Sequence, residues 1–166
     1  SGGFVRTRDL VRPEAQPRPE GVDPDGTWID VDVSDQTLVA YRGDRPVFAT
    51  LISSGRAGRH HATPLGTHRI WIKLAFSDMD NLQHDHLSQN YAIERVPWVQ
   101  YFEGSNGLHA AFWHDRFGHV RSHGCVNLSP ADARWLFRWA GPELPASWHG
   151  VFASRERAGS WVYITE

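Results

Sequence analysis

Residues 121–128 read Arg121-Ser122-His123-Gly124-Cys125-Val126-Asn127-Leu128, and they contain the only cysteine among the 166 residues of the chain. A lone cysteine cannot form an internal disulfide, so its value lies in packing or in reactivity. Most free cysteines behave as small buried hydrophobic residues. The neighbours of Cys125 in the sequence favour reactivity instead.

Histidines near the cysteine supply candidate proton acceptors: His109, His114, His119 and His123. A thiol attacks as its thiolate, and an ordinary pKa of about 8.5 leaves little thiolate at pH 7. A nearby imidazole can stabilise the thiolate as an ion pair and later shuttle the proton. His123 is two residues from Cys125, so in an extended segment both side chains share a face. His109 lies in the apolar run 108–113, which predicts a neighbouring strand that faces the thiol.

Gly124 directly precedes the cysteine. A glycine at this position lets backbone N–H groups approach a developing oxyanion without a Cβ in the way. A purely structural cysteine does not need such a neighbour. Gly124 therefore adds to the indication that Cys125 is a nucleophile.

The segment resembles the signature of L,D-transpeptidases of the YkuD type, which is a histidine, a gap, Ser/Thr-His-Gly-Cys, a hydrophobic residue, and Asn or Arg. His109 and residues 122–127 fill every position of this pattern. Residues 53–55 (SSG) and 62–67 (ATPLGT) resemble a second conserved segment of the family. The resemblance extends from about residue 27 to residue 142, and the His…SHGC motif is highly specific.

The resemblance implies a mainly β fold, a YkuD-like β-sandwich or mixed sheet with one or two helices, one of them after the cysteine. It also implies an exported bacterial enzyme of the periplasm or cell wall. Such enzymes cleave the bond between the third residue of a tetrapeptide stem, usually a diamino acid, and the terminal D-alanine. They pass the acyl group to an amine of another stem, which gives a 3→3 cross-link. The implied partners are donor and acceptor peptidoglycan stems, with carbapenem β-lactams as inhibitors, and no cofactor or metal is implied.

Transferred to this sequence, the resemblance makes Cys125 the nucleophile and His109 the general base that later protonates the leaving D-alanine. Backbone N–H groups of Gly124 and Cys125 would hold the oxyanion, and losing one such donor typically lowers the rate about 10²-fold. His123 would shape the pocket or tune the thiolate. The base of this family is oriented by a backbone carbonyl or by the next side chain. Since Ala110 follows His109, a carbonyl must serve.

Candidate substrate-binding residues flank the motif. Ser122 belongs to it, and Asn127 is expected to hold the loop or contact the peptide backbone. Arg121 can meet a stem carboxylate, because a guanidinium matches a carboxylate bidentately; plain solvation is the alternative.

Aromatic residues give a weaker signal for the cleft. Trp98, Tyr101 and Trp113 can wall the substrate cleft, or they can simply pack in the core. Family members have a flap over the site, and residues 77–104 are the candidate for it here.

Other interpretations stay open at this point. A metal site could combine Cys125 with histidines, although the chain has no HExxH or CxxC pattern. If water replaces the acceptor amine, the same residues make an L,D-carboxypeptidase or a cross-link hydrolase. A catalytically inert wall-binding module is disfavoured by the intact His109 and Cys125. The histidines of the metal alternative are His60-His61, His84 with His86, and His114 with His119.

The rest of the chain predicts mostly strands and one helix. Ser129 is a good N-cap, Pro130 suits the first helical position, and an apolar stripe then recurs at helical spacing up to Gly141-Pro142. Two of the strands are joined by Gly43-Asp44 and should form an antiparallel hairpin. Residues 77–90 are polar and predict a long loop. The expected strands are 29–33, 37–42, 46–52, 66–74 and 161–165, the first of them half-buried.

Composition bounds the domain organisation and the partners. Residues 1–26 are rich in proline and predict an extended arm or linker outside the core, and residues 27–166 predict the catalytic domain. Seventeen basic against nineteen acidic residues argue against a nucleic-acid partner, which usually requires a basic face. No apolar run approaches the roughly 20 residues that span a bilayer.

Overall fold

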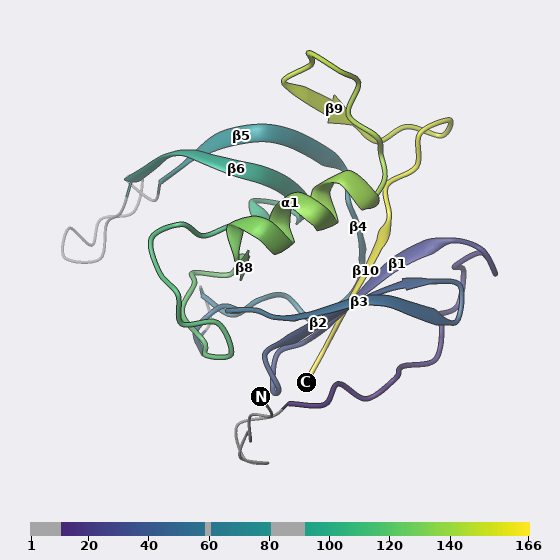
Figure 1. Cartoon of the computed structure of the whole chain (residues 1–166), viewed down its shortest axis with the longest axis horizontal. Coiled ribbons are helices and arrows are strands. Elements are labelled where there is room, and N and C mark those ends of the chain that lie inside the picture. The colour runs from purple at the N-terminus through teal and green to yellow at the C-terminus, as the bar shows by residue number, and fades with distance from the viewer. Residues whose placement is uncertain (1–10, 59–60, 81–91) are drawn as a thin grey trace, which may run out of the picture.

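The computed structural model describes residues 11–58, 61–80 and 92–166, which form two mixed β-sheets and a helix (Figure 1). The strand order is β3-β2-β1-β10-β4 in the first sheet and β8-β7-β6-β5-β9 in the second. The expected mainly β fold with a helix after the cysteine is confirmed. The elements are β1 Thr27–Asp32, β2 Thr37–Arg42, β3 Arg45–Leu51, β4 Gly66–Arg69, β5 Ile72–Asp80, β6 Ala92–Glu103, β7 Asn106–Ala110, β8 Val126–Leu128, α1 Pro130–Trp139, β9 Gly150–Phe152 and β10 Trp161–Thr165.

The first sheet is built around the expected hairpin. β2 and β3 pair antiparallel across the turn at Gly43, whose φ of 56° suits glycine. β1 pairs antiparallel with β2 and parallel with β10, so the late strand lies inside the sheet, between β1 and β4. β7 and β8 form the second parallel pair of strands. This parallel pair sets the segment of His109 directly beside the segment that follows Cys125.

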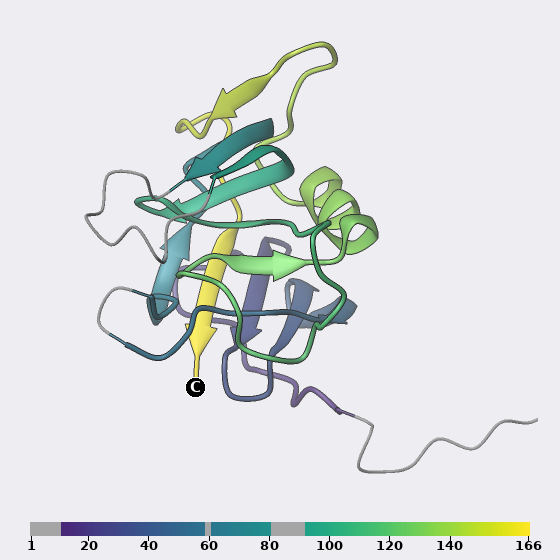
Figure 2. The ribbon, with the colours of Figure 1, turned by 90° about the vertical axis from the view of Figure 1, so that its left-hand side faces the viewer.

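Helix α1 packs against the second sheet and contributes residues to the main core. It begins and ends as the sequence predicts. The Ser129 hydroxyl accepts the Asp132 N–H at 3.2 Å, which caps the N-terminus. Leu136 on the apolar stripe is fully buried with residues of both sheets. At the other end the Lys73 Nζ donates to the carbonyls of Phe137 (2.5 Å) and Ala140 (2.6 Å), which otherwise lack helical partners. α1 lies against β6, β7 and β8 (Figures 1 and 2), so it anchors the cysteine segment.

Three predictions about strands need correction. The single strand expected at 66–74 is two strands, β4 and β5, which lie in different sheets. The chain changes sheets at Ile70 and Trp71, whose N–H groups donate to Ser160 and Tyr101 respectively. Residues 77–80 extend β5 and are not loop, whereas 81–90 lie outside the described residues. β6, β8 and β9 were not predicted as strands.

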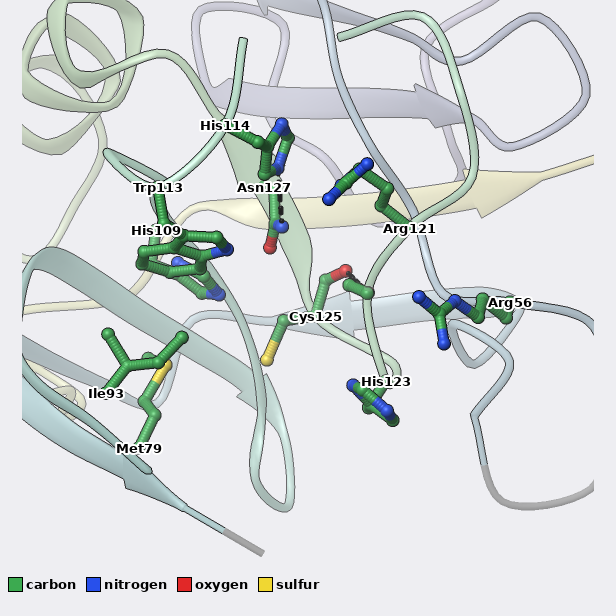
Figure 3. A pocket seen from close by; sticks show the side chains of 11 residues that line it. Arg56, Met79, Ile93, His109, Trp113, His114, Arg121, His123, Cys125 and Asn127 are labelled. Atoms are coloured by element: carbon green, nitrogen blue, oxygen red, sulfur yellow. Dashed lines mark hydrogen bonds between the residues drawn. The ribbon is translucent and has the colours of Figure 1, made fainter. Parts of the chain in front are cut away.

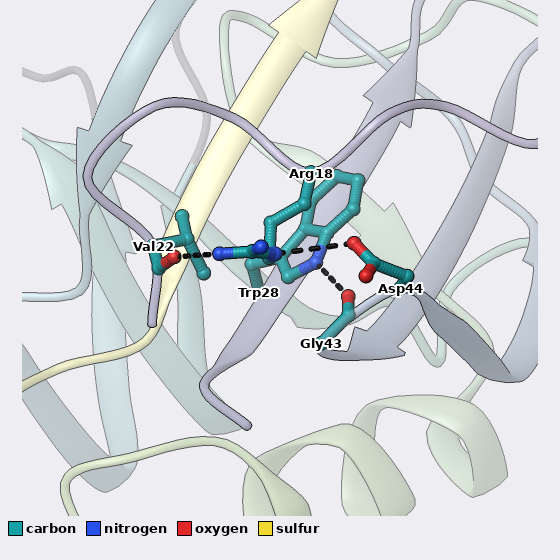
Figure 4. A network of polar contacts seen from close by, with 5 residues as sticks. All are labelled: Arg18, Val22, Trp28, Gly43 and Asp44. Atoms are coloured by element: carbon teal, nitrogen blue, oxygen red, sulfur yellow. Dashed lines mark hydrogen bonds and ion pairs between the residues drawn. The ribbon is translucent and has the colours of Figure 1, made fainter. Parts of the chain in front are cut away.

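The described part of the arm lies along the outer face of the first sheet (Figure 4). Arg18 forms an ion pair with Asp44 at 3.1 Å and donates to the Val22 carbonyl. The Trp28 indole N–H donates to the Gly43 carbonyl at 2.7 Å. Val22 is only 3% exposed and packs with Trp28, so the arm supplies a core residue, which the sequence did not predict.

The arm also changes the expected exposure of β1. A half-buried strand was predicted from the alternation of apolar residues with Asp30 and Asp32. In the structure Asp30 is 4% exposed, because the second face of β1 carries Trp28 and the cluster around Val22. The division of the chain at residue 26 into arm and domain stays a prediction. Within residues 11–58, 61–80 and 92–166 no helix has both the length and the apolarity to span a membrane.

Candidate active site

The cysteine loop is held on both sides by backbone hydrogen bonds. Ser53 and Asn127 exchange N–H···O bonds of 2.9 Å in each direction. Gly55 forms a parallel bridge with Ser122. Within the loop, the Ser122 hydroxyl donates to the Cys125 carbonyl and accepts the Gly124 N–H at 3.1 Å. Segments 53–55 and 121–127, which the resemblance singled out separately, therefore form one structural unit.

The loop requires glycine at two positions. Gly124 has a φ of 121°, which L side chains rarely adopt, and a Cβ there would collide with the Asn106 side chain. A Cβ on Gly55 would lie 2.9 Å from the Gly124 Cα and closer still to the backbone of His61. The Gly124 N–H, which was expected to help hold the oxyanion, instead donates to the Ser122 hydroxyl. Of the two expected donors, this leaves the Cys125 N–H.

The Cys125 thiol rests in its neutral form. Burial raises its pKa to about 11, although a backbone hydrogen bond from Gly107 acts in the opposite direction. The sulfur lies 3.6 Å from the Ser105 carbonyl oxygen, to which the thiol donates. Ser105 lies in the turn between β6 and β7, and Gly107 lies at the start of β7. The residues of that turn next to the thiol had no signal in the sequence.

His109 on β7 is prepared as a base. Its Nδ1 lies 2.9 Å from the Ala110 carbonyl oxygen, so Nδ1 carries the proton and Nε2 is left as the acceptor. The Ala110 backbone carbonyl therefore orients the imidazole, which the methyl side chain of Ala110 cannot do. Trp113 covers the imidazole with ring centroids 5.8 Å apart. Burial lowers the pKa of His109 to about 4. These two pKa values favour a neutral imidazole and a neutral thiol at pH 7.

A pocket of about 260 Å³ brings the motif residues together, and the thiol lies between two unlike walls (Figure 3). One wall carries His109 and Trp113 with the apolar side chains of Met79 and Ile93. The opposite wall carries Arg56, Arg121 and His123. The pocket is lined by Arg56, Met79, Ile93, His109, Trp113, His114, Arg121, Ser122, His123, Cys125 and Asn127.

His123 lies on the wall opposite His109 (Figure 3). The segment bends at Gly124, so the extended geometry assumed for His123 and Cys125 is wrong. The His123 ring meets the His61 ring edge-on at 4.8 Å. Burial, His61 and Arg56 together lower the pKa of His123. His123 thus belongs to the arginine side of the pocket.

The other predicted contacts divide into two groups. Arg121, Trp113, Ser122 and Asn127 line the pocket, and the Asn127 amide hydrogen-bonds the His114 Nε2 at 3.1 Å. Tyr101 lies beside the pocket: its hydroxyl is 3.5 Å from the Ser77 hydroxyl, and burial raises its pKa, with a smaller contribution from Cys125. Trp98 packs against the main core instead.

Met79 and Ile93 show how the expected flap contributes. They sit near the ends of β5 and β6, on either side of residues 81–91, which lie outside the described part of the chain. Both line the pocket. Neither had a signal in the sequence beyond its place in the flap range 77–104.

The metal alternative finds no cluster in the described part of the chain. Within residues 11–58, 61–80 and 92–166 no three His, Cys, Asp or Glu side chains are grouped as metal ligands. His119 is exposed and does not line the pocket, whereas His114 does. His60, His84 and His86 lie outside the described residues.

Residues 26–164 match the family model of the L,D-transpeptidase catalytic domain, YkuD. The chain therefore belongs to this family. The motif, the two mixed sheets and the single pocket lined by both His109 and Cys125 agree with that assignment. No curated protein sequence matches the chain.

Solved structures share the fold. An L,D-transpeptidase named LdtMt1, in complex with imipenem, matches with a TM-score of 0.68 and 22% identity over 85% of this chain and 59% of its own. A cysteine-to-serine mutant of the Enterococcus faecium L,D-transpeptidase matches with 0.65 and 20% over 87% and 50%. The Stackebrandtia nassauensis L,D-transpeptidase matches with 0.59 and 25% over 87% and 58%. The chain thus spans half to three-fifths of the length of these relatives.

Proposed function

We propose that this chain is the catalytic domain of a peptidoglycan L,D-transpeptidase of the periplasm or cell wall. It cleaves the bond between the third-position diamino acid and D-alanine of a tetrapeptide stem and joins the acyl group to an acceptor amine. The observation that supports this best is that Cys125 and His109 line one pocket, with the His109 Nδ1 bonded to the Ala110 carbonyl so that Nε2 is the proton acceptor. The acyl donor and acceptor are stem peptides.

Acylation starts from the neutral pair. His109 Nε2 removes the thiol proton while the Cys125 sulfur attacks the scissile carbonyl carbon, because the thiol does not ionise alone at neutral pH. The C–S bond forms and the carbonyl electrons move to oxygen, which the Cys125 N–H stabilises. Collapse breaks the C–N bond, and the imidazolium gives its proton to the leaving D-alanine amine. The products are a thioester and a neutral imidazole.

Deacylation reverses these roles. The acceptor amine attacks the thioester carbonyl carbon and loses a proton to His109 Nε2. The C–S bond breaks, and the departing sulfur takes the proton back as a thiol. A new amide bond is left, and the enzyme returns to its starting state. If water attacks instead, the same steps yield a free carboxylate, which is carboxypeptidase chemistry.

Mass spectrometry of the reaction with a disaccharide-tetrapeptide tests this proposal. A 3→3 cross-linked dimer and released D-alanine are expected from the wild type, and neither from Cys125→Ala. Tripeptide without dimer would replace the transpeptidase by a carboxypeptidase. Turnover by a folded Cys125→Ala protein would remove the proposed nucleophile.

Carbapenems give a second test of the same nucleophile. LdtMt1 was solved in complex with imipenem, and we propose that imipenem likewise acylates Cys125 here. The intact mass of the wild type should increase by the mass of one imipenem, and that of Cys125→Ala should not change. An unchanged wild-type mass after prolonged incubation would count against the mechanism.

A further inference from the structure

Arg56 and Arg121 both line the wall of the pocket opposite His109 (Figure 3). Their backbones are joined through the bridge between Gly55 and Ser122. The Arg56 N–H donates to the Ser122 carbonyl at 3.1 Å, and the Arg121 N–H donates to the Ser54 carbonyl at 2.9 Å. The backbones of the two arginines are therefore held by the same contacts that hold the cysteine loop, and both side chains line the pocket.

The described part of the chain supplies no acidic partner for the charges of these arginines. Neither Arg56 nor Arg121 forms an ion pair with an acidic side chain within residues 11–58, 61–80 and 92–166. Their fields reach the neighbouring imidazoles: Arg56 contributes to the lowered pKa of His123, and Arg121 to that of His114. This wall of the pocket thus favours an anion.

The chemistry of the two half-reactions assigns a direction to the donor peptide. The leaving amine takes a proton from His109 Nε2, and the incoming amine gives a proton to the same atom. Both amines must therefore approach on the His109 side of Cys125. The acyl portion of the donor is bound to the sulfur between the two steps. It therefore lies on the arginine side of Cys125.

We propose that Arg56 and Arg121 form a carboxylate-binding site for the acyl portion of the donor stem. The ligand is an acidic peptide whose carboxylate lies on the residues before the scissile bond, and the site therefore rests on the proposed transpeptidase function. Guanidinium groups match carboxylates bidentately and make stronger hydrogen bonds than neutral donors. The site selects acidic donors and orients the scissile carbonyl toward the thiol.

Two carboxylates of a stem peptide have the required chemistry. One is the second carboxylate of the diamino acid, and the other is the α-carboxylate of a γ-linked D-glutamyl residue before it. Amidation of either one removes its charge and keeps its size. The probes are L-Ala-γ-D-Glu-meso-diaminopimelate-D-Ala and its two singly amidated forms.

Equilibrium binding separates this site from catalysis. Calorimetric titration of the three peptides uses Cys125→Ala protein, which cannot turn them over, alone or combined with Arg56→Gln, Arg121→Gln or Arg116→Gln. Arg116 is an exposed arginine close in sequence that does not line the pocket, so Arg116→Gln is the matched control. Circular dichroism melting of each variant verifies that the fold is kept.

We expect Arg56→Gln and Arg121→Gln each to weaken binding of the unmodified peptide about tenfold at low salt. The same replacements should change binding less than about twofold for the peptide whose bound carboxylate is amidated, and Arg116→Gln should have no effect on any peptide. The amidated form that loses this dependence identifies the carboxylate. Equal weakening for all three peptides, no weakening, or no measurable binding would overturn the proposed site.

Turnover by the enzyme with its cysteine intact keeps the two proposals distinguishable. If dimer forms equally well from all three peptides and in both arginine variants, the transpeptidase function stands and the carboxylate site is refuted. If no peptide is turned over but binding still depends on Arg56, Arg121 and the carboxylate, the site stands and the proposed reaction is refuted.

Discussion

The cysteine pocket and the arm-covered face of the first sheet each bury a side chain whose charged form is disfavoured. In the pocket, burial lowers the pKa of His109 to about 4. On the other face, burial raises the pKa of Asp30 to about 6, with a smaller contribution from Asp32. One carboxylate oxygen of Asp30, Oδ1, has no hydrogen-bond partner among the described residues.

The two regions differ in whether the buried group reaches a pocket and in which groups surround it. His109 has an orienting carbonyl, a thiol in the same pocket and space for a substrate. Asp30 is buried on β1 within electrostatic reach of Tyr41, and it is not among the residues that line the cysteine pocket. A perturbed pKa marks a functional site only together with such geometry. Four changes test this contrast.

The largest effect is expected for His109→Gln. Without the Nε2 acceptor, the neutral thiol has no base, and general-base catalysis contributes roughly 10²- to 10⁴-fold. We therefore expect imipenem acylation of Cys125 to slow by about a thousandfold, measured as the rate of mass increase. Asp30→Asn should leave this rate unchanged. An unaffected rate in His109→Gln would break the comparison by showing that the buried imidazole has no catalytic role.

The pH dependence follows from the same buried imidazole. His109 has to be neutral to act, and its pKa of about 4 keeps it neutral down to that pH. The acid limb of the acylation rate should therefore lie near pH 4 and not near the ordinary histidine value of about 6.5. A limb between pH 6 and 7 would contradict the neutral resting pair. Initial acylation rates from pH 4 to 8 make this measurement.

Gly124→Ala is expected to have the next largest effect. Its φ of 121° and the Asn106 side chain both oppose a Cβ, so the loop must shift and displace the Cys125 N–H from the oxyanion. Losing one oxyanion donor lowers rates about 10²-fold, and acylation should slow by this amount. Gly58→Ala is the matched control, since Gly58 has a φ of 130° but nothing within 4 Å of its Cβ position. Equal acylation rates in the two variants would assign the effect to backbone strain alone.

The contrast also shows what the sequence can predict. Cys125, His109 and the helix from Pro130 were predictable because a local motif and local capping residues specify them. The neutral forms of Cys125 and His109 were not predictable, since they depend on burial by segments distant in the sequence. Arg56 is sixty-six residues from Ser122 in the sequence, and only their backbone contact reveals that it belongs to the site.

The strands were likewise predictable only where a local sequence pattern specifies them. β1, β2, β3 and β10 follow clear apolar alternation and were expected. β6 was missed because Glu94, Arg95 and Pro97 interrupt its pattern, and Arg95 has a φ of 53°. The break between β4 and β5 was missed because Ile70, Trp71 and Ile72 form an unbroken apolar run while the chain passes from one sheet to the other. The residues of a strand do not specify which strand it pairs with.

Asp30→Asn should affect stability and leave acylation unchanged. The folded state disfavours the Asp30 carboxylate, so the penalty is present above pH 6 and is lost as the pH falls toward 3.8. Removing the charge should stabilise the protein by about 2 kcal/mol at pH 7.5, and by much less at pH 4.5. His109 has the opposite effect on stability. Below pH 6.5 its imidazole binds a proton in the unfolded chain but stays neutral in the folded protein down to about pH 4, so the free energy of unfolding falls.

Urea unfolding at both pH values measures this difference. Asp25→Asn is the control, because Asp25 is exposed in the described arm. A stabilisation by Asp30→Asn that does not depend on pH would mean that the buried carboxyl is not charged at neutral pH. A loss of acylation would place Asp30 in the site and break the distinction between the two regions.

Arg18→Gln is expected to have the smallest effect. Its ion pair with Asp44 is largely exposed on the Asp44 side, and exposed pairs contribute about 0.2–1 kcal/mol. The bond from Arg18 to the Val22 carbonyl adds to this, because it holds the arm where Val22 enters the core. Arg18→Gln should therefore lower the free energy of unfolding by about 1 kcal/mol, and Asp44→Asn by less, because the bond to Val22 remains. Arg12→Gln, an exposed arginine of the arm, should change nothing. If Arg18→Gln instead slowed acylation by Cys125, the arm would be coupled to the pocket, and the two faces of the domain would not be independent.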